Sequence, residues 1–202
     1  MNRAKWQSGD KITISFLDGA PELREKVKAV AQTWTGREMA NVQFVFQRDT
    51  DSMIRVSFRE KGSWSAIGAT CMSRKDVTRP TMNFGWLKSD SSDDKVRRAV
   101  LHEFGHALGL IHEHQHPDHP IDWNRDAVIK DLSTGSNSWS LAEIEENMFG
   151  AYQRKETNFT SFDPESIMLY PIPKSWTRNR FSVGLNAKLS NNDKDFIRQQ
   201  YP

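Results

Sequence analysis

All six histidines of this 202-residue chain lie between His102 and His119. Two of them stand four residues apart, at the ends of the run His-Glu-Phe-Gly-His from His102 to His106. Residues four apart in a helix lie on one face, so both imidazoles can bind one metal ion at about 2.0–2.1 Å. Glu103, about 100° around the helix from His102, lies near such an ion without having to bind it. This H-E-x-x-H spacing is typical of a zinc site whose carboxylate acts as a general base.

A third imidazole, that of His112, can join the site only if the helix ends first. On a continuous helix it would lie about 15 Å along the axis from His102, too far to share an ion. Gly109 stands three residues after His106. At a helix end a left-handed conformation suits glycine, whereas other residues lose about 1–2 kcal/mol there. The spacing therefore predicts two helical ligands, a glycine reversal and a third ligand beyond it. Three imidazoles leave one position of a tetrahedral zinc ion for water.

Composition excludes several other classes of protein. With 28 Lys and Arg against 26 Asp and Glu, the net charge is only +2, so we expect no nucleic-acid partner. The single cysteine, Cys71, excludes an internal disulfide and a multi-thiolate zinc site. We interpret it as a small half-buried residue, with an inhibitory thiolate on zinc as the alternative. We expect no membrane span, because the apolar run 107–111 is too short, and residues 1–6 lack the apolar stretch of a signal peptide.

Hydrophobic periodicity predicts an α+β fold. Alternation predicts strands at 11–16, 42–46, 54–58 and 81–84, and helical spacing predicts helices at 21–34 and from 93 through the histidines. Residues 61–79 predict a long loop, because they are rich in Gly, Ser and charge. Beyond His112 we expect irregular structure with short helices at 124–132, 140–152 and 190–201. We expect a monomer with one domain, residues 1–202, divided into an upper lobe of about 1–112, a lower lobe of about 113–202 and a zinc cleft between them.

The histidine motif resembles a known signature. The run His102-Glu103-x-x-His106-x-x-Gly109-x-x-His112 is similar to the zinc signature of the metzincin metallopeptidases. Glu113, directly after the third histidine, resembles the residue that marks the astacin family within that group. Residues 166–170, Ser-Ile-Met-Leu-Tyr, resemble the methionine-containing turn of the same proteins. The similarity extends from about Trp6 to Tyr201, although the chain lacks the paired cysteines that are usual in astacins.

This resemblance implies a fold, a chemistry and a set of roles. The fold would be a twisted mixed sheet with two long helices in the upper lobe and an irregular lower lobe. One catalytic zinc ion would be held by His102, His106 and His112, with Tyr170 as a further ligand that moves to bind the transition state. Glu103 would act as general base and then as proton donor to the leaving amine. Met168 would form an apolar floor below the imidazoles. The resemblance also implies a secreted protein.

Several residues allow two interpretations. Tyr170 is either a donor to the oxyanion or an aromatic residue that packs under the site. His114, His116 and His119 are either extra ligands or, as we favour, solvated side chains of a loop. Lys174, Arg178 and Arg180 predict a preference for Asp or Glu after the scissile bond, unless they form a solvated basic loop.

The strand around Phe84 and Trp86 is a candidate edge where an extended substrate could add as a further strand. We interpret the chain as a zinc-dependent endopeptidase that acts on proteins or peptides. The alternatives are an inactive zinc-stabilised binding module and a zinc hydrolase of a non-peptide amide.

Overall fold

The structure is a computed structural model that describes residues 4–134, 138–150, 158 and 160–202. The chain forms two compact units, one of Met1–Ile111 with Ala187–Pro202 and one of His112–Asn186. The final helix therefore belongs to the first unit, whereas the expected lower lobe ran on to residue 202. The backbone explains this difference, because the N–H of Asn41 donates to the carbonyl of Tyr201 at 2.9 Å.

The first unit contains a five-stranded mixed sheet in the order β2-β1-β3-β5-β4. Strand β1 lies parallel to β2 and β3, β3 lies parallel to β5, and β4 runs antiparallel to β5 at the edge. The expected α+β class is thus confirmed. The prediction of a loop over 61–79 is wrong at β4, which has only three residues, too few for a clear alternation. The bounds of the strands are Lys11–Phe16 for β1, Gln43–Phe46 for β2, Ile54–Ser57 for β3, Ser63–Ser65 for β4 and Met82–Phe84 for β5.

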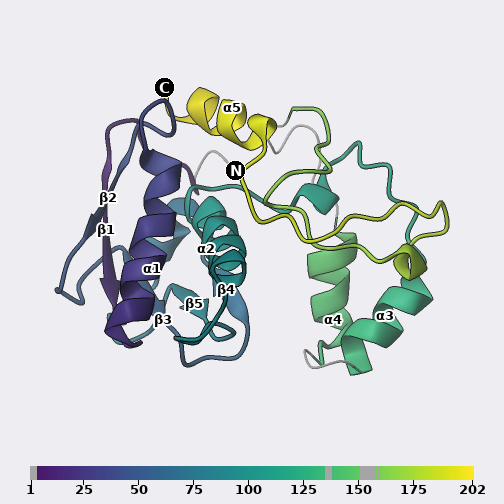
Figure 1. Cartoon of the computed structure of the whole chain (residues 1–202), viewed down its shortest axis with the longest axis horizontal. Coiled ribbons are helices and arrows are strands. Elements are labelled where there is room, and N and C mark those ends of the chain that lie inside the picture. The colour runs from purple at the N-terminus through teal and green to yellow at the C-terminus, as the bar shows by residue number, and fades with distance from the viewer. Residues whose placement is uncertain (1–3, 135–137, 151–157, 159) are drawn as a thin grey trace. The chain divides into compact units, whose positions relative to one another are not determined.

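Two long helices, α1 (Pro21–Ala31) and α2 (Asp93–Ala107), run side by side in this unit (Figure 1). Helix α2 begins at Ser92, whose hydroxyl accepts from the N–H of Lys95 and so satisfies one free donor of the first turn. Its buried face includes Phe104, which meets Phe44 of β2 edge to face at 5.2 Å between ring centroids. This packing fixes the axis of the helix that carries the histidine motif.

The second unit is mostly irregular in its described residues, as expected, and these include two short α-helices. These are α3 (Arg125–Thr134) and α4 (Leu141–Ile144), and α4 continues as one π-helical turn to Phe149. The expected end of the helix at 152 lies outside the described residues. Two apolar clusters stabilise this unit, one of Val128, Ile144 and Met148 and one of Ile121, Leu169 and Ile172.

Helix α5 (Asn191–Gln200) begins with a capping box between Ser190 and Asp193. Among the residues that the structure describes, no helix has the length and apolar character needed to cross a bilayer.

Candidate metal centre

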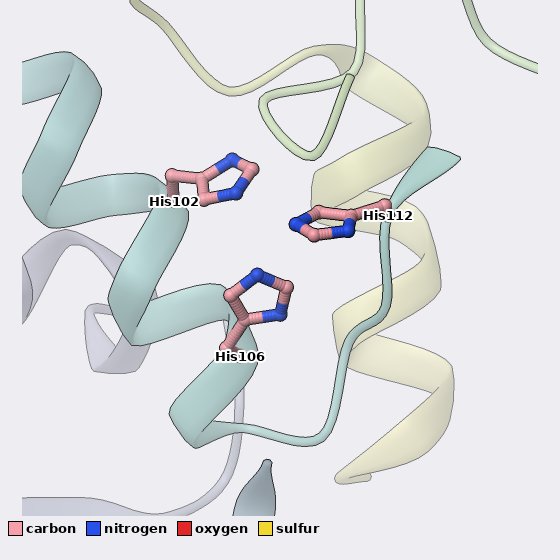
Figure 2. A group of neighbouring side chains, drawn as sticks. All are labelled: His102, His106 and His112. Carbon is pink, nitrogen blue, oxygen red and sulfur yellow. The ribbon is translucent and has the colours of Figure 1, made fainter. Parts of the chain in front are cut away.

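Helix α2 presents His102 and His106 on one face, one turn apart (Figure 2). Their ring centroids are 4.8 Å apart and their planes are nearly perpendicular. Both side chains are buried. The helix therefore orders two potential nitrogen ligands in advance of any ion.

The chain reverses immediately after this helix. Gly109 has φ of +90°, in the region that favours glycine. The N–H of Gly109 donates to the carbonyl of His106 at 2.8 Å, and the N–H of Leu110 donates to that of Gly105 at 3.0 Å. These two bonds form a Schellman motif, which ends the helix and directs the following residues back along it. His112 follows three residues after the glycine.

The reversal brings a third ring to the first two. One nitrogen from each of His102, His106 and His112 lies within 4.8 Å of the others (Figure 2). An ion bound by all three would lie about 2.0–2.1 Å from each nitrogen. His106 Nδ1 lies 2.9 Å from the carbonyl oxygen of Leu110. Because a carbonyl can only accept, Nδ1 must carry the proton, and Nε2 is the nitrogen left for a metal.

Burial sets the charge of the groups at this site. It lowers the pKa of His106 to about 4, so the imidazole is neutral near pH 7, the form that binds a metal. Burial also raises the pKa of Glu103 to about 8, partly opposed by the Arg98 guanidinium. The Oε2 atom of Glu103 is buried and has no hydrogen-bond partner in the described part of the chain. A buried carboxyl oxygen without a partner, in the residue that follows His102 in the helix, fits a divalent cation and its water.

Tyr170 and the methionine turn lie in the second unit, around His112. The rings of Tyr170 and His112 are 4.4 Å apart between centroids, so Tyr170 touches the third candidate ligand. The N–H of Glu113 donates to the carbonyl of Met168 at 3.1 Å. Oε1 of Glu113 accepts from the N–H of Asp163 at 2.7 Å. The segment that carries His112 is thus bonded directly to the turn that carries Met168 and Tyr170.

The prediction of solvated loop side chains is wrong for His114 and His116. Both are buried, and their Nε2 atoms lie within 2.8 Å of the carbonyls of Asn147 and Thr160, respectively. The ring of His114 also stacks on that of His112, with 5.1 Å between centroids, and packs at a tilt against that of Tyr170, with 5.0 Å between centroids. The sequence analysis did not predict this contact. The one feature of the sequence that could have suggested it is the spacing of two residues between His112 and His114. His119 is half-buried, and its pKa is lowered by burial and by the neighbouring His116.

The remaining predicted residues lie in varied surroundings. Cys71 is buried, and burial raises the pKa of its thiol to about 11, so it stays protonated near pH 7. This favours a packed residue over a thiolate ligand, although Cys71 is fully rather than half-buried. Phe84 is wholly buried in β5, so it does not line an edge, whereas Trp86 is exposed. The side chains of Lys174, Arg178 and Arg180 are exposed in the second unit.

Comparisons with known proteins agree with this geometry. A family model described as Astacin, a peptidase family, matches residues 1–202. A solved structure of myroilysin is 41% identical in sequence, with a TM-score of 0.94 over 99% of this chain and 96% of that one.

Two further relatives are more distant. The zinc metalloproteinase nas-19 of Caenorhabditis elegans is 27% identical over 153 residues, which are 74% of this chain and 34% of that protein. The chain thus spans about a third of the length of that relative. The high choriolytic enzyme 1 of Oryzias latipes, a hatching enzyme zinc-protease, shares the fold at 18% identity and a TM-score of 0.66, over 99% of this chain and 95% of that one.

The match over the whole chain, together with three histidines positioned to bind one metal ion, confirms the predicted resemblance. The chain belongs to the astacin family of zinc metallopeptidases.

Proposed function

We propose that this protein is a zinc-dependent endopeptidase in which Glu103 is the general base. The observation that carries the proposal is the position of the Glu103 carboxyl group. Glu103 lies between His102 and His106 in the sequence. Its Oε2 atom is buried and has no hydrogen-bond partner in the described part of the chain. A buried carboxylate without a structural partner is costly, which is expected of a group kept for proton transfer.

A zinc ion held by the three imidazoles would polarise a water molecule and the carbonyl of a peptide bond. Glu103 takes a proton from the attacking water and passes it to the nitrogen of the leaving amine. Burial raises the pKa of Glu103 to about 8 even with the Arg98 guanidinium opposing the shift. A divalent cation held by the imidazoles would lower this pKa further, so that the carboxyl would both accept and release a proton near neutral pH.

Tyr170 is the proposed donor to the oxyanion that forms on the peptide carbonyl. Its ring packs against the imidazoles of His112 and His114, and these contacts hold the phenol beside the third ligand. A preorganised hydroxyl of this kind stabilises charge that develops only in the transition state. The same phenol is the candidate fourth protein ligand of the resting site.

For substrates, we propose proteins or peptides with an acidic residue after the scissile bond. Arg178 and Arg180 supply exposed positive charge on the segment after the methionine turn. The backbone there is held in place, because the hydroxyl of Thr177 donates to the carbonyl of Phe181 at 2.7 Å. Profiling on a peptide library should show enrichment of Asp and Glu, weakened in Arg178→Ala and Arg180→Ala. A purely apolar preference would contradict the assignment.

The decisive experiment compares Glu103→Gln with wild type in casein hydrolysis and in zinc content. We expect activity to fall by at least about a hundredfold while one zinc per chain is retained, since loss of a general base costs about 10²–10⁴-fold. Glu22→Gln, an exposed glutamate in the first turn of α1, is the matched control and should retain activity. Zinc binding without any hydrolysis by the wild type would instead favour an inactive zinc-stabilised binding module.

A further inference from the structure

The carbonyl groups at the C-terminal end of helix α2 receive their hydrogen bonds from two different sources. The last four carbonyls of a helix lack partners within it and must be satisfied from elsewhere. Backbone N–H groups of the glycine reversal satisfy the carbonyls of Phe104, Gly105 and His106. The carbonyls of Ala107 and Leu108, the two residues directly before Gly109, do not take part in these bonds. Both lie in the buried interior of the unit.

Two side chains from opposite ends of the sequence reach these two carbonyls. The indole N–H of Trp6 donates to the carbonyl of Ala107 at 2.8 Å. The hydroxyl of Tyr201 donates to the carbonyl of Leu108 at 2.7 Å. Both aromatic side chains are buried, Tyr201 being only 1% exposed. The carbonyls of Ala107 and Leu108 are therefore each held by a buried side-chain donor, which water does not displace.

The Tyr201 hydroxyl also lies close to Gly109. Burial raises the pKa of this hydroxyl to about 12, so it keeps its proton and remains a donor. A Cβ atom added to Gly109 would have the Ala4 carbonyl oxygen and the Tyr201 hydroxyl as its nearest neighbours, both at 3.9 Å. Ala4 in turn packs its backbone against Gly68, where an added Cβ would lie 1.9 Å from the Ala4 oxygen.

We propose that Trp6 and Tyr201 are positioning residues for the zinc site, which act through the carbonyls of Ala107 and Leu108 to hold the reversal that delivers His112. This inference rests on the proposed function of the triad as a zinc site. Neither residue is itself a candidate ligand. Each fixes the backbone between the second and third ligands, where a small rotation would swing the third imidazole away from the other two.

The test measures the metal site itself rather than activity. Tyr201→Phe removes one hydroxyl and keeps the buried ring, and Trp6→Phe removes the indole donor. Two properties are measured: the rate at which zinc is lost to excess chelator, and the visible absorption spectrum of the cobalt-substituted protein, which reports ligand geometry. Trp34→Phe is the matched control, because the indole of Trp34 donates to the carbonyl of Leu101 at 2.9 Å in the middle of the same helix.

We expect Tyr201→Phe and Trp6→Phe to speed zinc loss about tenfold and to change the cobalt spectrum, as when a group that supports a metal ligand is removed. Trp34→Phe should lower the thermal midpoint but leave both properties of the metal site as in wild type. The inference is overturned if Tyr201→Phe matches wild type in both measurements, or if Trp34→Phe speeds zinc loss equally. Failure of the proposed zinc site would look different, because the wild type itself would then bind neither zinc nor cobalt.

Discussion

Replacement of Gly109 by alanine tests whether the reversal after α2 delivers the third ligand. Gly109 has φ of +90°, and the nearest atoms to an added Cβ lie 3.9 Å away, so alanine meets no steric overlap and only backbone strain. That strain is about 1–2 kcal/mol. If the variant relieves it by turning residue 109 to negative φ, His112 leaves the triad. Zinc binding must then restore the strained backbone, and zinc affinity should fall by the same energy, about 5–30-fold.

Gly9→Ala is a closely matched control. Gly9 has φ of +91°, nothing lies within 4 Å of an added Cβ, and it precedes β1, apart from the histidine motif in sequence. Both variants should lose about 1–2 kcal/mol of unfolding free energy in urea, but only Gly109→Ala should bind zinc more weakly in competition with a chromophoric chelator. Equal zinc affinity in the two variants would refute the reasoning.

Three further predictions concern single groups. Tyr170→Phe keeps the ring and removes the hydroxyl, so kcat for a peptide should fall about 10²–10³-fold with little change in KM, whereas unchanged kcat would leave Tyr170 a packing residue. In metal-free protein the folded-state pKa of Glu103 is raised to about 8, so its stabilising contribution is complete below its ordinary pKa and is lost as pH rises. Between pH 7 and 8, above the pKa of His106 in both the folded and the unfolded chain, urea unfolding should show a loss of roughly 1 kcal/mol that Glu103→Gln abolishes; a flat profile in the wild type would contradict the burial of a protonated carboxyl. The Cys71 thiol, buried with a pKa of about 11, should resist a disulfide reagent at pH 8 until the protein unfolds, and rapid reaction of native protein would contradict this.

The parts of the fold that sequence predicted well depend on contacts between near neighbours. The helices predicted to begin at about 93, 140 and 190 begin within one residue of those positions, where caps at Ser92, Ser140 and Ser190 join residues three apart. The positive φ of Gly109 follows from the spacing of the histidines around it, and it too is confirmed. Such features depend on a few adjacent residues, so a pattern in the chain is enough to identify them.

The features that sequence missed depend on distant partners. Trp6 and Ala107 are 101 positions apart, and Tyr201 and Leu108 are 93 apart, so no local pattern pairs them. From its neighbours in the sequence, His114 is predicted to be a solvated loop residue. Its burial is explained by its contact with the carbonyl of Asn147, 33 positions away. The position of the last helix in the first unit was missed for the same reason. Irregularly spaced polar residues in a loop are exposed to solvent only when no distant group forms hydrogen bonds with them, and a local sequence pattern does not reveal such a group.

The central claim is that three imidazoles hold one zinc ion, and the most direct test is to measure zinc content together with X-ray absorption at the zinc edge. Wild-type protein, dialysed against metal-free buffer, should retain one zinc per chain with three histidine nitrogens at about 2.0–2.1 Å. His112→Ala should lose either the metal or one of those nitrogens. Wild-type protein that retains no zinc, or a His112→Ala spectrum identical to wild type, would contradict the account.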